Sequence, residues 1–406
     1  SVEFEILSET NLFIAYPAAI IRYVGEKWHT TAHSSQRLLS EKSGDDYDKI
    51  TSKLVAVEGN ITIHKNKEEP FFIIHNGDNE ISTGFLEITL TDKGGLNKTV
   101  RIKNFNFKKI ETKFCYLKDF IDYNKYIKGS YGTYKLKFQI FGIFPRIIAG
   151  NIDKKTQAWS VDHTNFADNE SEEIASDVFN VSNEPDYKDL VFCVPNNYSQ
   201  NWECFTDFYP TYPNDNYLIV KKDKRTNFSD HKLYVNKNSE NIIPRIYHTS
   251  NLNNELIFKH KQKLPNRFHT GIHYRIDNGP TAFLTDGPLP HHTPGIKTRW
   301  LPLFEYGINN NYIMISNRAT GSEKQKQITF NAELYNESLL DPLKSKIVIE
   351  PDETICLEIS EIFNEADKYM NSSSGWVYLT SLEIQECVIH YASVKNNNSI
   401  ACDHAF

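Results

Sequence analysis

Two pairs of histidines at a four-residue spacing are the first candidates for chemistry in this sequence. His29 and His33 form one pair, and His269 and His273 form the other. Residues four apart share a face in a helix and also in a strand. Imidazole is a common metal ligand, so the two pairs, with Asp162 as a carboxylate ligand, are candidates for one divalent metal site. Because the chain holds 14 histidines, coincidental spacing is the competing explanation.

A second pattern is an Asp-His pair that closes two similar segments, at Asp162-His163 and Asp403-His404. Neighbouring side chains of a strand point to opposite faces, so the two members of one pair cannot act together as a catalytic dyad. We therefore expect these four residues to close the two segments structurally. We also expect Phe406, the last residue, to fill a core.

Several classes of function lack their sequence motifs. GxSxG, GxGxxG and Walker A patterns do not occur, and Thr30 stands where the glutamate of HExxH would follow His29. The six cysteines form no CxxC pair, which argues against a zinc ribbon. A net charge of -7 disfavours nucleic-acid binding. No stretch reaches transmembrane length and no leader is visible in the given sequence, so we expect a soluble, cytoplasmic protein without membrane insertion. Export is the alternative, if Ser1 follows a cleaved leader.

The elements that must position these residues are predicted to be short antiparallel strands. Aromatic residues make up 13% of the chain, and runs of alternating polarity are separated by turn clusters rich in Gly, Asn, Asp and Pro. Helical periodicity is confined to 117–126 and 359–370. The pattern predicts an all-β fold of tandem antiparallel β-sandwich modules.

An internal repeat supports the tandem arrangement. Segments 83–166 and 326–406 show the same order of strands, turns and a short helical piece, with Gly132 and Gly375 in corresponding positions. A third, diverged copy is expected between them, with Gly271 in the place of Gly132. The expected organisation begins with an N-terminal segment, 1–60, that completes or caps the first module, 61–166. An acidic linker, 167–190, follows. A diverged second module, 191–296, and a third module, 297–406, complete the expected arrangement.

The C-terminal pattern carries a resemblance. Gly375-Trp376-Val377-Tyr378, followed by the stretch from Ser399 to Asp403-His404-Ala405-Phe406, resembles the ends of uncharacterised bacterial proteins linked to surface-polysaccharide gene neighbourhoods. The resemblance covers about the last 80 residues well and the first copy less well. It implies a β-sandwich repeat protein associated with glycans, and it assigns no catalytic residues.

The function expected from these observations is binding or scaffolding, with a glycan or a protein as partner and no complete catalytic motif. Exposed aromatic residues such as Trp159, Trp202, Trp300 and Trp376 would suit stacking on sugars, although most of them are more simply explained as core or edge residues. One alternative is a metal-dependent enzyme that acts on a sugar or small metabolite through the histidines. Another is a shell-like assembly protein that forms homo-oligomers.

Overall fold

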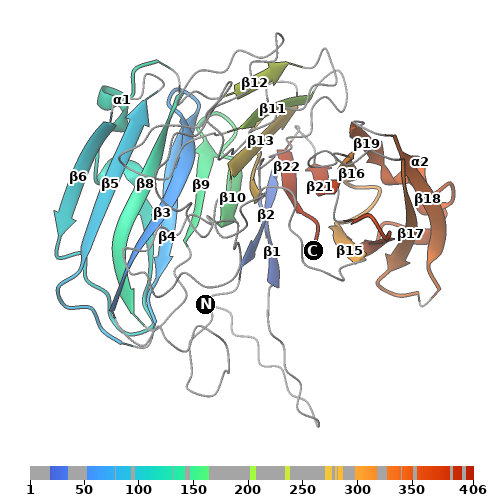
Figure 1. The fold of residues 1–406 in the computed structure, drawn as a ribbon, viewed down its shortest axis with the longest axis horizontal. Coiled ribbons are helices and arrows are strands. Elements are labelled where there is room, and N and C mark those ends of the chain that lie inside the picture. Colours follow the sequence, from blue (N-terminus) through green and yellow to red (C-terminus); the bar gives the residue numbers. More distant parts are fainter. Residues whose placement is uncertain are drawn as a thin grey trace, which may run out of the picture.

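The computed structural model is all-β, as the sequence predicts, and consists mainly of four-stranded antiparallel sheets (Figure 1). It describes residues 19–34, 53–77, 79–92, 97–129, 131–141, 147–163, 202–206, 234–237, 270–276, 279–280, 282–286, 298–317, 327–339, 341–350, 354–384, 387–395 and 399–406. No helix within these ranges is long and apolar enough to cross a membrane.

The first sandwich packs two four-stranded sheets, in the orders β3-β8-β5-β6 and β10-β9-β4-β7, around one core. Phe72 of one sheet and Leu86 and Tyr134 of the other belong to the same buried cluster. The strands are β3 (Lys53–His64), β4 (Glu68–His75), β5 (Phe85–Asp92), β6 (Asn97–Lys103), β7 (Thr112–Tyr116), β8 (Tyr131–Phe141), β9 (Ile148–Asp153) and β10 (Trp159–His163).

The C-terminal sandwich has the sheet orders β15-β20-β17-β18 and β19-β16-β21-β22. Counted along the chain, its eight strands occupy the same sheet positions as the eight strands of the first sandwich. The strands are β15 (Thr298–Leu303), β16 (Asn310–Asn317), β17 (Ile328–Asn336), β18 (Leu343–Ile349), β19 (Thr354–Glu358), β20 (Gly375–Thr380), β21 (Cys387–Lys395) and β22 (Ser399–His404).

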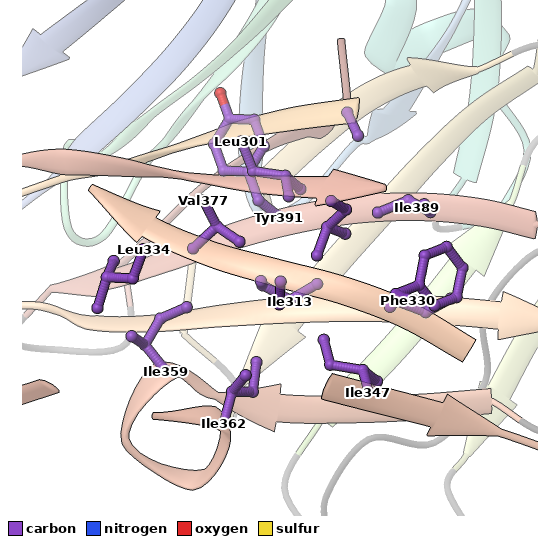
Figure 2. Close-up of a cluster of buried hydrophobic side chains, with 14 of the residues drawn as sticks. Leu301, Ile313, Phe330, Leu334, Ile347, Ile359, Ile362, Val377, Ile389 and Tyr391 are labelled. Atoms are coloured by element: carbon purple, nitrogen blue, oxygen red, sulfur yellow. The ribbon is translucent and has the colours of Figure 1, made fainter. Parts of the chain in front are cut away.

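Alternation along β17 shows why these segments become strands. Every second residue from Ile328 to Leu334 is buried, and the residues between them are exposed or half-buried. A period of two places all the apolar side chains on one face of the sheet. Figure 2 shows Phe330 and Leu334 packed with Ile313, Ile347 and Tyr391 of other strands in the core of this sandwich.

The short helical pieces fall where the sequence predicts them. In the first sandwich they are η2 (Leu117–Asp119) and α1 (Tyr123–Tyr126), and in the last they are α2 (Ile359–Ile362) and α3 (Ala366–Met370). Leu117 and Ile359 are fully buried, so each piece contributes to the core of its sandwich.

A close backbone approach explains the glycine that opens β20. A Cβ atom on Gly375 would lie 2.1 Å from the carbonyl oxygen of Tyr335 on the adjacent strand. Cβ atoms in proteins essentially never come this close to a backbone atom, so the position requires glycine. Gly375 pairs with Asn336, the last residue of β17. Gly132 pairs in the same way with Asp92, the last residue of β5. The two glycines therefore take equivalent places in their sheets.

The described middle part of the chain is one sheet in the order β12-β11-β13-β14, formed by β11 (Trp202–Thr206), β12 (Tyr234–Lys237), β13 (Thr270–Ile276) and β14 (Ala282–Asp286). In this order β13 takes the place of β9 and β21, the strands that open the last hairpin of each sandwich. Gly271 therefore does not correspond to Gly132, which lies in β8. The predicted correspondence was wrong. A glycine near the start of a strand with aromatic residues occurs both in β8, at Gly132, and in β13, at Gly271, although the two strands have different places in their sheets.

The N-terminal hairpin of β1 (Ala19–Val24) and β2 (His29–Ser34) joins the larger sheets at the centre of the molecule. β2 packs against β10 and β22, and β14 packs against the same two strands. Figure 1 shows β2 beside β10 and β22, between the two sandwiches. We call these four strands, β2, β10, β14 and β22, the hub. Each of them is the second strand of an antiparallel hairpin.

The predicted domain boundaries stay predictions. Strand β3 runs without interruption from Lys53 to His64, so it crosses the expected limit at residue 60 and belongs wholly to the first sandwich. The expected acidic linker, 167–190, lies outside the described residues.

Candidate functional site

Strand β2 is polar in sequence yet buried. Two of its threonine hydroxyl groups form hydrogen bonds with backbone groups of the neighbouring strands β10 and β22. Val161 of β10 donates its backbone N–H to Thr30 Oγ1 at 3.2 Å. On the other side, Thr31 Oγ1 donates to the carbonyl oxygen of Cys402 in β22, also at 3.2 Å. Buried polar groups are tolerated when they are hydrogen-bonded in this way. The two threonines therefore hold β2 between the closing strands of both sandwiches.

His33 lies at the centre of the hub and contacts residues of both Asp-His pairs. Its Nδ1 is 2.7 Å from Asp403 Oδ2, and its Nε2 is 2.7 Å from His163 Nε2. The ring centroids of His33 and His404 are 4.5 Å apart, at an interplanar angle of 79°. His33 is 6% exposed, and His163 and Asp403 are fully buried. Three imidazoles therefore meet at one point, two of them buried and that of His404 half-buried.

Two of these three imidazoles have their tautomers set by neighbouring acceptors. The Asp403 carboxylate accepts the Nδ1 proton of His33, which leaves the lone pair of His33 on Nε2. The backbone oxygen of Ala405 lies 3.0 Å from Nδ1 of His404 and accepts its proton, so the lone pair of His404 is likewise on Nε2. His163 directs its own Nε2 at that of His33. The cluster thus presents nitrogen lone pairs as potential ligands.

The two aspartates of the hub, Asp162 and Asp403, are fully buried and lie close together. Each uses Oδ1 to accept the backbone N–H of the histidine that follows it, at 2.6 Å in Asp162-His163 and 2.8 Å in Asp403-His404. One atom from each carboxylate and one nitrogen of His33 lie within 4.8 Å of one another. A nearby positive charge, such as a metal cation, would stabilise two buried carboxylates at this distance.

Phe406 connects the hub to the edge of the C-terminal sandwich. Its backbone N–H donates to the carbonyl oxygen of Trp300 at 3.0 Å, and the N–H of Trp300 donates to the carbonyl oxygen of Phe406 at 2.8 Å. The Phe406 ring lies 4.7 Å from that of His33 and 5.1 Å from that of Trp300, measured between centroids. The last residue is therefore packed against the buried histidine cluster.

His29 lies in the same strand as His33 but has a separate role. Its Nε2 donates to the carbonyl oxygen of Ser393 at 2.7 Å, and its Nδ1 accepts from Arg22 Nη2 at 3.1 Å. Both ring nitrogens of this fully buried side chain are therefore engaged. Four residues of a strand also span about 13 Å, too far for one ion to bind both histidines. The structure does not support the predicted pairing of His29 with His33 on a metal.

Burial and the neighbouring positive charges of Arg22 and Lys395 lower the pKa of His29 to about 4. In the unfolded chain a histidine has a pKa near 6.5. Between pH 6.5 and about 4 the imidazole of His29 is therefore protonated in the unfolded state but neutral in the folded state. The stabilisation is complete above pH 6.5 and is lost as the pH falls towards 4. At pH 4.5 we expect His29 to account for about 2–3 kcal/mol of lost stability.

The substitution His29→Gln tests this expectation, because glutamine keeps a donor for Ser393 and an acceptor for Arg22 but cannot take up a proton. Urea unfolding at pH 7.5 and pH 4.5 should show a smaller loss of stability in the variant than in the unsubstituted chain. Equal losses in both proteins would mean that His29 is not the acid-sensitive group.

Arg22 also ties the N-terminal hairpin to the C-terminal sandwich outside the hub. Its Nη2 lies 2.9 Å from Glu305 Oε2, and its guanidinium lies 4.9 Å from the ring centroid of Phe304. The hydrogen bond from Arg22 lowers the pKa of Glu305. The hairpin therefore contacts this sandwich along both of its strands.

The remaining predicted metal ligands have mixed outcomes. Asp162 lies in the cluster with His33, as described above. His269 lies outside the described residues. Strand β13 contains His273, whose backbone pairs with Phe283 of β14. The structure does not describe the side chain of His273.

Sequence reasoning missed that the histidines of the two Asp-His pairs meet His33. The available signal was a histidine next to the last residue of one hub strand and an Asp-His pair at the end of two others, but the two patterns were treated as separate candidates. Comparison of the chain with protein-family models finds no match, and comparison with curated proteins finds none either. The residues and contacts above are thus the basis for assigning a function.

Proposed function

We propose that this protein is a multi-sandwich protein that binds or organises glycans, without an evident complete catalytic motif. The observation that carries the proposal is a set of aromatic side chains on the outer face of the sheet β15-β20-β17-β18. We call this set, Trp300, Tyr335, Trp376 and Tyr378, the aromatic face. Trp300 and Trp376 are 38% and 39% exposed, which is unusual for side chains of this size on a strand.

The register of the sheet brings these side chains together. Trp300 of β15 pairs with Tyr378 of β20, and Trp376 of β20 pairs with Tyr335 of β17. The rings of Trp376 and Tyr335 are stacked, with centroids 5.3 Å apart and an angle of 7° between their planes. The four positions thus form two adjoining rows across three neighbouring strands.

Polar groups beside the aromatic face suit the hydroxyl groups of a sugar. Glu333 pairs with Tyr378, and its carboxylate accepts from the Tyr335 hydroxyl at 2.8 Å and lies 3.1 Å from Lys344 Nζ. An aromatic ring offers an apolar surface to the C–H face of a pyranose, while carboxylate and ammonium groups bind its hydroxyls. Cross-strand aromatic pairs also stabilise a sheet without any ligand, so the experiment must separate binding from stability.

A glycan array followed by calorimetric titration of the best ligand tests the proposal. Truncating one anchoring tryptophan costs about 1.4 kcal/mol or more at an interface, so Trp300→Ala and Trp376→Ala should each weaken binding at least tenfold. Phe114→Ala is the matched control, because Phe114 is a similarly exposed aromatic residue of the first sandwich. Absence of any glycan ligand, or equal binding by all three variants, would contradict the proposal.

The alternative of a metal-dependent enzyme rests on the imidazoles of the hub. A catalytic metal keeps one coordination position open to substrate, whereas structural sites are closed. Since His33 and His163 are almost completely buried, their arrangement favours a structural role for any bound ion. The shell-like assembly stays a prediction, which a concentration-dependent symmetric oligomer would support.

A further inference from the structure

We propose that His33, His163 and His404 bind one divalent transition-metal ion that fastens β2 to β10 and β22. The three residues come from three different hairpins. His33 is 130 residues from His163 in the sequence, and 370 residues from Asp403, which precedes His404. An ion bound by all three would therefore link the N-terminal hairpin to the last strand of each sandwich. This inference is independent of the glycan-binding proposal.

The spacing of the nitrogens suits one ion. One ligand nitrogen from each of the three imidazoles lies within 4.8 Å of the other two. Nitrogens bound to one tetrahedral ion at 2.0–2.1 Å are about 3.3 Å apart. The 2.7 Å between Nε2 of His33 and Nε2 of His163 needs to open by only about half an ångström, which small rotations of the two side chains provide.

The groups behind two of the ligands are those that metal-binding histidines use. A ligating histidine usually donates its other ring N–H to a carboxylate or a backbone carbonyl, which fixes the orientation of the ring. Asp403 has this place behind His33, and the Ala405 carbonyl has it behind His404. His163 would bind the ion with its proton on Nδ1, so the ion would replace the proton that His33 and His163 otherwise share.

The charge of the cluster also favours a cation. Asp162 and Asp403 are both fully buried beside the imidazoles, and a divalent ion would stabilise the two carboxylates. Three nitrogen ligands suit zinc, copper, nickel or cobalt, whereas magnesium and calcium prefer oxygen ligands. A tetrahedral ion bound by three imidazoles keeps one further coordination position, and the burial of His33 and His163 restricts access of a substrate to it.

Titration of the 406-residue chain with Co²⁺ and Zn²⁺ after treatment with a chelator tests the proposal directly. We expect one ion per chain, the visible absorption of tetrahedral Co²⁺, loss of that absorption when Zn²⁺ displaces Co²⁺, and a rise of several degrees in Tm with Zn²⁺. The unsubstituted protein gives these readouts, so the test does not depend on whether a variant folds.

Variants then locate the site. His163→Gln and His404→Gln should each weaken Co²⁺ binding at least a hundredfold, and Asp403→Asn should weaken it about 10–100-fold. His29→Gln is the matched control, since His29 is equally buried in β2 but has both nitrogens engaged elsewhere. Circular dichroism confirms that each variant is folded.

Two results would overturn the proposal. One is the absence of stoichiometric Co²⁺ or Zn²⁺ binding by the unsubstituted chain at micromolar concentration. The other is binding that folded His163→Gln and His404→Gln retain, or that His29→Gln loses to the same extent, because the ion would then bind elsewhere.

Discussion

His33→Ala is expected to lower the free energy of unfolding by about 3 kcal/mol, even in the presence of a chelator. The substitution removes the imidazole that donates to Asp403 and contacts His163, and it leaves the buried Asp403 carboxylate without this donor. Removing the partner of a buried hydrogen-bonded group costs about 1–3 kcal/mol, and more for a charged group, because the remaining group stays desolvated. Guanidinium unfolding followed by circular dichroism measures the change.

His75→Ala is the control for the loss of a histidine from a strand. His75 ends β4, is half-buried, and bonds to Thr112 at the surface of the first sandwich. We expect its loss to cost less than about 1 kcal/mol, as is usual for substitutions away from buried networks. If His33→Ala and His75→Ala unfold at the same denaturant concentration, the hub does not carry the stability assigned to it.

Phe330→Ala is expected to cost about 3–5 kcal/mol through the cavity that it leaves. Phe330 is fully buried in β17 and packs in the core of the C-terminal sandwich (Figure 2). Sheets on both sides contribute to this core, so the backbone cannot collapse into the space without disturbing strand pairing. Thermal and chemical unfolding of the variant should both show the loss.

The matched control is Val348→Ala on the neighbouring strand. Val348 is on the outer face of β18 and is 49% exposed, so its truncation removes little buried surface. A loss below about 1 kcal/mol is expected for it. A Phe330→Ala variant as stable as Val348→Ala would show that this sandwich does not have the core described.

The sequence predicts the strands well because the signals for them are local. The alternation from Ile328 to Leu334 and the turn clusters between strands report on a face of a sheet without reference to its partners. The short helical pieces at 117–126 and 359–370 are local in the same sense. Gly271 shows what such local signals do not predict. A glycine near the start of a strand occurs at both Gly132 and Gly271, but the two strands have different places in their sheets.

The site depends on packing between hairpins, which local patterns do not encode. His29 and His33 share a strand and a spacing, yet His29 binds the backbone of β21 while His33 meets β10 and β22. The Asp162 carboxylate accepts the backbone N–H of His163, and the ring of His163 contacts His33 on β2. The repeated Asp-His pairs indicated which strands matter, but not that a third strand would supply the central histidine.

Anomalous X-ray diffraction at the zinc absorption edge, from crystals grown with Zn²⁺, would locate an ion bound in the hub. We expect one strong anomalous peak, about 2.1 Å from a ring nitrogen of each of His33, His163 and His404, with Asp403 still bound to Nδ1 of His33. A hub without anomalous density, in which His33 and His163 remain joined by a direct hydrogen bond, would contradict it.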